Sequence, residues 1–393
     1  MQDSVYLAWQ YLKYNKLRTV ILIACITITS SLPISLNLLL KASEKQLLAR
    51  ASTTPLLVGK KGSDVDLTVN SLYFVSQPSE AISMADVEQI KQSELAQPIP
   101  LDVRFQARNY PIVGTTIDYF DFRQLSLKKG TYFTVLGDCI LGANVAQKLG
   151  LKPGDSLVSS PNVLFDLGGV YPLEMKVTGV LNKQYTADDD AIFTDIKTTW
   201  VIQGLGHGHQ DLTKTGSSDV ILNREKDDVT ANAKLPQFTE ITPENIGSFH
   251  FHGNPENFPL TAAIAVPFDQ KSSDLLRGRY ETAKSDRLIL QPTTVIQALL
   301  QEIFKIQTLL NVILMLVALA TLLAIVLIFN LSLQLRQAEI ETSFKLGCSR
   351  ATMARLITAE IIIILLISLS FTAIITAGLS TYRYQLTRTL ISR

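Results

Sequence analysis

Histidine is rare in this chain, and its four copies form two closely spaced pairs. His207 and His209 lie in the segment GHGHQD, and His250 and His252 lie in FHFHGN. Side chains two positions apart point to the same face of a β-strand, so each pair can offer two imidazoles to one ion. Neutral imidazole is a favoured ligand of Zn²⁺ and of similar divalent metals. The pattern therefore predicts a zinc site made of these four histidines.

Two acidic segments bear on this prediction. Asp211 follows the first pair and could replace one imidazole, and the run from Asp188 to Asp190 could add a carboxylate. The run is more typical of a turn cap or of a solvated surface, because adjacent carboxylates do not face each other as an acid–base pair. The alternative for the histidines is an ordinary role in strands and loops, with hydrogen-bonded ring nitrogens. The sequence leaves open whether the two pairs meet.

No enzyme motif accompanies the histidines. The sequence contains neither G-x-S-x-G nor H-E-x-x-H, and it has no phosphate-binding G-x-x-x-x-G-K-[ST] loop. The segment from Gly59 to Asp64, GKKGSD, has the wrong spacing and is predicted to be a surface turn. The chain is therefore predicted not to be an enzyme. A net charge of +1 gives no indication of a nucleic-acid partner.

Three apolar segments are long enough to cross a lipid bilayer. They run from Val20 to Leu40, from Val312 to Phe329 and from Leu356 to Ser380. Apolar stretches of about 20 residues span the hydrocarbon core as helices. The third contains Glu360, which is expected to be interfacial or paired, with Arg355 as the candidate partner. A cleaved signal peptide is the alternative for the first segment, but that segment is longer than a usual signal core and no A-x-A site follows.

The segment between the first two apolar runs is typical of a soluble domain. Residues 42–291 hold strand-like runs such as LEMKVTGVL and LTAAIAVP, helical runs such as ISMADVEQIKQS, and turn signals such as KPGD. This mixture predicts an α+β domain, in one lobe or two. From Pro292 a helical pattern continues into the second apolar run. It predicts one helix of roughly 57 Å, whose excess length would stand outside the bilayer as a stalk.

The distribution of basic residues favours one orientation in the membrane. The short loop after the second apolar run carries four of them: Arg336, Lys345, Arg350 and Arg355. This loop is therefore predicted to be cytoplasmic, with the N-terminus on the same side and residues 42–291 outside. The basic C-terminal tail disagrees, because three spans would place it outside. Of the three cysteines only Cys139 would face the outside, so no internal disulfide is predicted.

Three stretches of the sequence resemble one family of membrane proteins. They are Leu7 to Thr19 with an N-K-x-R-T motif, Leu335 to Glu360 with R-x-x-E-I and L-G-x-S motifs, and Ile140 to Val158 with A-x-x-L-G-L-x-x-G-D. Together they resemble permeases of the MacB/FtsX/LolC type, the mechanotransmission class of ABC transporters. LTVNSLYF and the segment around the second histidine pair also resemble members of this family that are associated with zinc-responsive operons.

The resemblance implies an α-helical membrane protein with a large α+β extracytoplasmic domain between its first and second transmembrane helices. The implied parts are a cytoplasmic amphipathic helix (1–18), transmembrane helix 1 (19–41), the extracytoplasmic domain (42–291), a stalk with transmembrane helix 2 (292–331), a cytoplasmic coupling loop (332–355), transmembrane helix 3 (356–380) and a tail (381–393). The family usually has a fourth span, so either this span is absent here or the sequence is truncated.

The resemblance also implies an assembly in the bacterial inner membrane. Two permease subunits, identical or different, would join a cytoplasmic ABC ATPase dimer and transmit its ATP-driven motion to the periplasmic domain. The residues expected to contact the ATPase are Phe344, Lys345, Leu346 and Gly347, with Arg336, Glu339 and Glu341 on the same short helix or its rim. The alternative for this loop is a plain basic anchor between two spans.

The cargo implied by the histidines is zinc or a metal-bearing partner. Three alternatives stay open. The chain could release lipoproteins, or export a small molecule through a periplasmic or lipoprotein accessory partner. It could also regulate a cell-wall hydrolase without any transport.

Overall fold

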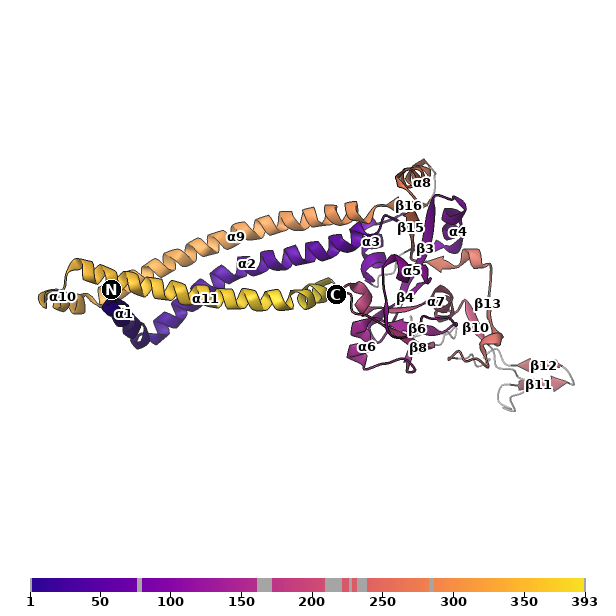
Figure 1. Cartoon of the computed structure of the whole chain (residues 1–393), viewed down its shortest axis with the longest axis horizontal. Coiled ribbons are helices and arrows are strands. Elements are labelled where there is room, and N and C mark those ends of the chain that lie inside the picture. The colour runs from indigo at the N-terminus through magenta and orange to yellow at the C-terminus, as the bar shows by residue number, and fades with distance from the viewer. Residues whose placement is uncertain are drawn as a thin grey trace. The chain divides into compact units, whose positions relative to one another are not determined.

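The structure is a computed structural model that describes residues 2–75, 80–160, 172–208, 221–225, 228–231, 239–282 and 286–391. The described chain divides into two compact units. The helical unit contains the residues up to Lys45 and those from Leu300 to Ile391, and the folded domain runs from Gln46 to Leu299. Figure 1 labels the elements of both.

The helical unit is built from long helices. Its elements are α1 (Gln2–Tyr14), α2 (Lys16–Ser52), α9 (Pro292–Leu335), α10 (Gln337–Lys345) and α11 (Arg350–Ile391). Among the described residues, α2, α9 and α11 are long and apolar enough to cross a membrane. The helix of the second apolar run begins at Pro292, as predicted. The third helix does not end near residue 380 but continues through the segment that was expected to be a tail.

Apolar contacts hold these helices side by side (Figure 1). Leu12 of α1, Leu22 of α2 and Ile364 of α11 are buried together, with side chains of α9 packed against them. One polar contact lies between α2 and α9, where Gln307 Nε2 donates to Asn37 Oδ1 at 2.6 Å. Such a hydrogen bond between apolar helices fixes how the two are rotated against each other.

A ten-stranded mixed sheet forms the centre of the folded domain. Its strands are β1 (Leu56–Lys60), β3 (Ala96–Ala107), β4 (Tyr110–Thr115), β5 (Leu127–Gly130), β6 (Asp138–Leu141), β7 (Ser156–Val158), β8 (Glu174–Leu181), β9 (Ile192–Asp195), β15 (Ala262–Pro267) and β16 (Arg287–Leu290). The order is β16-β1-β15-β3-β4-β9-β6-β8-β5, with β7 beside β8. The pairs β4–β9 and β6–β8 are parallel, and the others are antiparallel.

Shorter elements surround this sheet. The strands are β2 (Ile82–Ser83), β10 (Gly206–Gly208), β11 (Ile221–Glu225), β12 (Asp228–Ala231), β13 (Phe249–Phe251) and β14 (Pro259–Leu260). The helices are α3 (Asp64–Tyr73), α4 (Met84–Gln92), α5 (Asp118–Phe122), α6 (Ala143–Leu149), α7 (Ile196–Ile202) and α8 (Gln270–Thr282), with short 3₁₀ turns at Ala187–Asp190, Ile246–Ser248 and Pro255–Asn257. The local sequence explains where several of these helices and strands begin or end. At the start of α4, for example, the Asp86 carboxylate accepts the Ser83 backbone N–H at 2.7 Å and caps the helix.

Two hydrophobic clusters pack against the same sheet, so the domain is one lobe with two cores. One gathers around Ile112, Val145 and Met175, and the other around Trp200 and Leu260. Phe251 packs against both clusters. The α+β prediction is confirmed, and the domain is one continuous sheet with two adjoining cores.

Candidate metal centre

The segment FHFHG begins with strand β13 (Phe249–Phe251) and alternates aromatic and imidazole side chains. It pairs antiparallel with β10 in the register Gly206↔Phe251, His207↔His250 and Gly208↔Phe249. Successive side chains point to opposite faces of a strand, so this ribbon has a Gly/Phe face and a histidine face. A Cβ at Gly206 would lie 2.6 Å from the Phe251 ring, and one at Gly208 would lie 2.7 Å from the Phe249 ring. The glycines of GHG therefore leave room for the two rings to lie across the partner strand.

The aromatic face fastens this ribbon to the domain. The ring of Phe251 lies 6.3 Å from that of Trp200 and 5.9 Å from that of Phe258, between centroids. Phe251 also bridges the two hydrophobic clusters of the domain. Because this face is turned to the core, the histidine face is turned away from it.

Three of the four predicted ligands meet on that outer face. One ligand nitrogen each from His207, His250 and His252 lies within 4.8 Å of the other two. Nε2 of His252 and Nε2 of His207 are 3.3 Å apart. Two nitrogens bound to one tetrahedral Zn²⁺ at 2.0–2.1 Å are separated by about 3.3–3.4 Å. The separation of this one pair matches the spacing of two imidazoles on a shared zinc ion.

Backbone contacts orient two of the rings. Nδ1 of His250 lies 3.1 Å from the carbonyl oxygen of Ser248. A carbonyl only accepts, so Nδ1 carries the proton and Nε2 keeps its lone pair for a metal. The His252 backbone N–H donates to the carbonyl of Leu205 at 2.9 Å, which continues the strand pairing past β13. This bond holds His252 on the same side as His250.

The three rings are accessible from solvent. His250 and His252 are exposed and His207 is half-buried. In the part of the chain that the structure describes, the group consists of these three histidines alone. His209 and Asp211, the other predicted ligands, lie outside the described residues. These three imidazoles are the side chains of the described residues that could hold a divalent ion.

Of the two roles expected for the run Asp188 to Asp190, the structure shows the turn cap and not the solvated surface. Asp188 and Asp189 are buried, and Asp188 forms an ion pair with Arg50. Asp189 accepts the backbone N–H groups of Gln184 and Tyr185 at 2.9 and 2.7 Å, so it caps a turn as expected. The carboxylate of Asp188 neutralises a buried guanidinium, which explains why it is not exposed.

The predicted ATPase-coupling residues form the end of α10. The backbone N–H of Gly347 donates to the carbonyl of Phe344, and that of Cys348 donates to Ser343, each at 3.0 Å. Gly347 has φ +90°, so this L-G step is a left-handed helix stop that favours glycine. Leu346 is 84% exposed and Phe344 39%. Two large apolar side chains are thus presented to solvent at one helix end.

Glu360 has partners that the sequence did not reveal. Nη1 of Arg336 donates to Glu360 Oε1 at 3.1 Å, and Nη2 of Arg18 lies 3.9 Å from Glu360 Oε2. The predicted pairing with Arg355 is wrong. Side chains five positions apart lie on different faces of a helix, whereas those three or four apart are neighbours.

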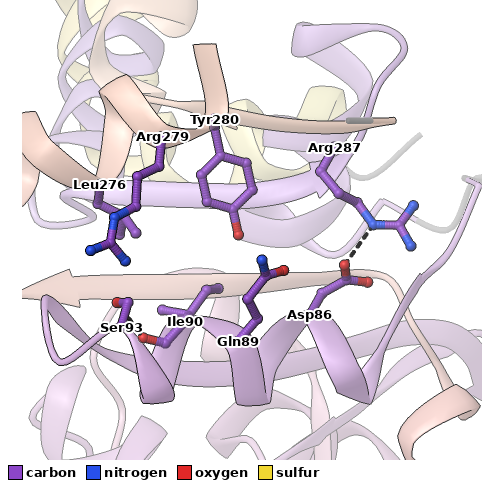
Figure 2. Close-up of a pocket in the computed structure, with 8 residues that line it drawn as sticks. All are labelled: Asp86, Gln89, Ile90, Ser93, Leu276, Arg279, Tyr280 and Arg287. Carbon is purple, nitrogen blue, oxygen red and sulfur yellow. Dashed lines mark hydrogen bonds and ion pairs between the residues drawn. The ribbon is translucent and has the colours of Figure 1, made fainter. Parts of the chain in front are cut away.

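A cavity of about 210 Å³ opens between α4 and α8 (Figure 2). It is lined by Asp86, Gln89, Ile90, Ser93, Leu276, Arg279, Tyr280 and Arg287. Nε of Arg287 donates to Asp86 Oδ1 at 2.8 Å across one side of it. The cavity contains none of the predicted ligands, so the three histidines lie outside this hollow.

Residues 20–234 match the family of the MacB-like periplasmic core domain, which is more than half of the 393 residues. The chain belongs to the MacB/FtsX-type family of ABC transporter permeases. In this MacB-like permease the matched segment contains the first apolar helix and β10 with His207, and it ends before β13. The histidine centre therefore joins a strand inside the matched segment to one beyond it.

Two solved structures are similar to parts of this chain. One is the periplasmic region of MacB from Actinobacillus actinomycetemcomitans, which is 13% identical and gives a TM-score of 0.35. The match covers 64% of this chain and 97% of the MacB chain. The extracellular domain of the noncanonic ABC-type transporter YknZ from Gram-positive bacteria is 12% identical, with coverages of 60% and 98% and a TM-score of 0.33. The search of curated proteins found no match.

Proposed function

We propose that this MacB-like permease transmits the ATP-driven motion of a partner ATPase to its periplasmic domain, and that this domain binds zinc or a metal-bearing partner. The observation that carries the metal assignment is the group formed by His207, His250 and His252 on the outer face of the β10–β13 ribbon. Three imidazoles without a thiolate suit Zn²⁺ and other late divalent ions. The fourth position is left for water, for His209 or for a ligand that the partner brings.

The membrane topology is part of this proposal. Arg18 at the start of α2 and Arg336 just before α10 contact the same carboxylate, Glu360. This contact supports an arrangement in which the N-terminus and the coupling loop lie on one side of the bilayer. The basic residues of the loop favour the cytoplasm for that side. The folded domain, which is inserted between α2 and α9, is then periplasmic in an inner-membrane protein with several spans.

The proposed contact with the ATPase is the end of α10. Phe344 and Leu346 are exposed there, beside Lys345 and the helix stop at Gly347. Exposed apolar side chains at one helix end are suited to a pocket on a protein partner. By analogy with the family, that partner is a cytoplasmic ATPase dimer that binds two permease subunits and supplies all ATP chemistry.

The position of the ribbon offers a way to link metal binding to motion. Its aromatic face is held by Phe251, whose ring packs on both clusters of the domain core. A shift of one cluster against the other would move this ring. Because the ring belongs to β13, the imidazoles on the other face of the strand would move with it. ATP-driven deformation of the domain would then alter the separation of the three nitrogens and with it the affinity for the ion.

The experiment is a calorimetric zinc titration of the full-length permease in detergent. The wild type should bind one ion, and the variant His250→Ala/His252→Ala should bind none. Glu256→Gln, an exposed change close to the same strand, should bind as the wild type does. Undiminished binding by the double variant would remove the metal assignment.

A second experiment tests the cargo, with the permease and its cognate ATPase in liposomes. Zinc-independent release of a lipoprotein or small molecule would favour those alternative cargoes.

A further inference from the structure

Three charged side chains meet where four segments of the helical unit come together. Arg18 belongs to α2, Arg336 follows the last residue of α9, and Glu360 lies on α11. Arg336 Nη1 donates to Glu360 Oε1 at 3.1 Å, and Arg18 Nη2 is 3.9 Å from Glu360 Oε2. Arg18 also donates to the hydroxyl of Ser332 in α9. This group of side chains therefore connects all three long helices.

An aromatic ring extends this group to α1. The guanidinium carbon of Arg336 lies 3.6 Å from the ring centroid of Tyr11, and that of Arg18 lies 5.1 Å from it. Arg18 Nη1 is also 3.4 Å from the Tyr11 hydroxyl. Guanidinium groups over an aromatic ring are attracted to its face. Helix α1 is thus tied to the same two arginines.

The group is sheltered from solvent to a degree that a surface ion pair is not. The side chain of Glu360 is 3% exposed, against 14% for Arg336 and 20% for Arg18. A carboxylate removed from water in an apolar helix is costly unless it is paired. Its retention at this place, with two cations around it, requires a reason other than helix packing.

The reason lies in the position of Arg336. This residue is the N-cap of α10, and its Nε is 3.5 Å from Glu339 Oε2 in the first turn of that helix. The same guanidinium therefore contacts both α10 and α11. Helix α10 buries none of its own residues, so the contacts of Arg336 are a main connection between this helix and the other helices.

We infer that Arg18, Arg336 and Glu360 form an ionic joint that makes α1, α2, α9 and α11 move together when the ATPase displaces α10. The inference rests on the proposed coupling function and is independent of the metal centre. Without the joint, α10 would be attached to α9 by a single non-helical residue, and its displacement would be absorbed by bending there. With it, a pull on Arg336 acts on the carboxylate of α11 and on the Tyr11 ring that both arginines contact.

The test uses the full permease and its cognate ATPase in liposomes of bacterial polar lipid. Glu360→Gln keeps the size of the side chain and removes its charge. We expect the variant to bind the ATPase normally but to lower permease-stimulated ATP turnover by about tenfold, which lies within the range for changes in coupling networks. Arg355→Gln removes an exposed charge on the same helix and should leave the turnover unchanged.

A second variant separates a joint from a merely stabilising contact. Arg336→Gln/Glu360→Gln removes both partners and leaves one arginine, Arg18, without a counter-charge, whereas Glu360→Gln leaves two. We expect its thermal stability to recover toward the wild type while the stimulation stays low. Recovery of stimulation together with stability would overturn the joint, as would normal stimulation in Glu360→Gln. A wild-type permease that does not stimulate its ATPase would instead overturn the proposed function, and the joint with it.

Discussion

Arg50 and Asp188 form a two-pronged ion pair at the end of α2. Nη1 of Arg50 is 2.5 Å from Asp188 Oδ2, and Nη2 is 2.9 Å from Oδ1. The same guanidinium donates to the hydroxyl of Tyr119 at 2.8 Å and to the carbonyl of Leu72. Both charged side chains are buried. The last turn of the first apolar helix is therefore fixed to the interior of the folded domain by a paired and hydrogen-bonded charge.

Removing one partner of this pair should destabilise the folded domain strongly. Arg50→Ala leaves the carboxylate of Asp188 buried without a counter-charge, which costs about 3–5 kcal/mol. Urea unfolding in detergent, followed by Trp200 fluorescence in a Trp9→Phe background, measures the loss. Lys129→Gln removes an exposed charge of the same sign and should change the unfolding free energy by less than about 0.5 kcal/mol. A loss no larger than that of this control would contradict the assignment.

The same pair predicts a defined pH dependence. Burial by itself would raise the pKa of Asp188, but the charge and hydrogen bonds of Arg50 outweigh it and lower the pKa from 3.8 to about 2. A carboxyl whose pKa is lower in the folded state stabilises the fold above its ordinary pKa, and this stabilisation disappears as the pH falls toward the folded value. The stability difference between the wild type and Asp188→Asn should stay constant from pH 5 to 7 and shrink below pH 4. A difference that varies between pH 5 and 7 would point to another group.

Features written in short stretches of sequence were predictable. The three apolar helices follow from length and composition, and the start of α9 at Pro292 follows from a residue that suits the first helical turn. The strand at Ala262–Pro267 follows from a β-type run between turns. In the same way the spacing of His250 and His252 in FHFH predicts two imidazoles on one side of a strand.

Contacts between distant segments were not predictable in this way. Glu360 stood out as a charge in an apolar run, but its partners Arg18 and Arg336 come from other helices, whereas the predicted Arg355 was chosen for nearness in sequence. The meeting of His207 with the second pair depends on the register of β10 against β13. The alternation of Gly with His in one segment and of Phe with His in the other is the sequence feature that could have indicated this pairing.

Zinc should stabilise the permease against heat. A ligand at one hundred times its Kd that binds only the folded state adds about 2.7 kcal/mol, which for a domain of this size raises Tm by roughly 5–10 °C. His252→Ala should lose most of the shift, because it removes the nitrogen 3.3 Å from His207 Nε2. Mg²⁺ prefers oxygen ligands and should give no shift. Equal shifts with both ions would argue against an imidazole site.

Cysteine labelling tests the proposed orientation. Cys139 was expected on the extracytoplasmic side. It is buried in β6 of the folded domain, and burial raises the pKa of its thiol, so it should not react with a maleimide until the domain unfolds. Cys348 follows the stop of α10 and should react with a membrane-impermeant maleimide only after the cells are opened. Asn254→Cys, at an exposed position near the histidines, should react in intact spheroplasts. The reverse pattern for Cys348 and residue 254 would invert the topology.

A single change at the end of α10 should separate the permease from its ATPase. Leu346 is 84% exposed, so Leu346→Asp should leave the fold intact while it places a charge where an apolar contact is proposed. We expect co-purification with the ATPase to be lost and stimulated ATP turnover to fall by at least tenfold, because burial of an unpaired carboxylate in an interface costs several kcal/mol. Leu346→Met keeps the apolar contact and should behave as the wild type does. Since Glu360→Gln is expected to retain ATPase binding, the two variants distinguish docking at α10 from transmission through the ionic joint. Normal binding and turnover in Leu346→Asp would move the docking surface away from this helix end.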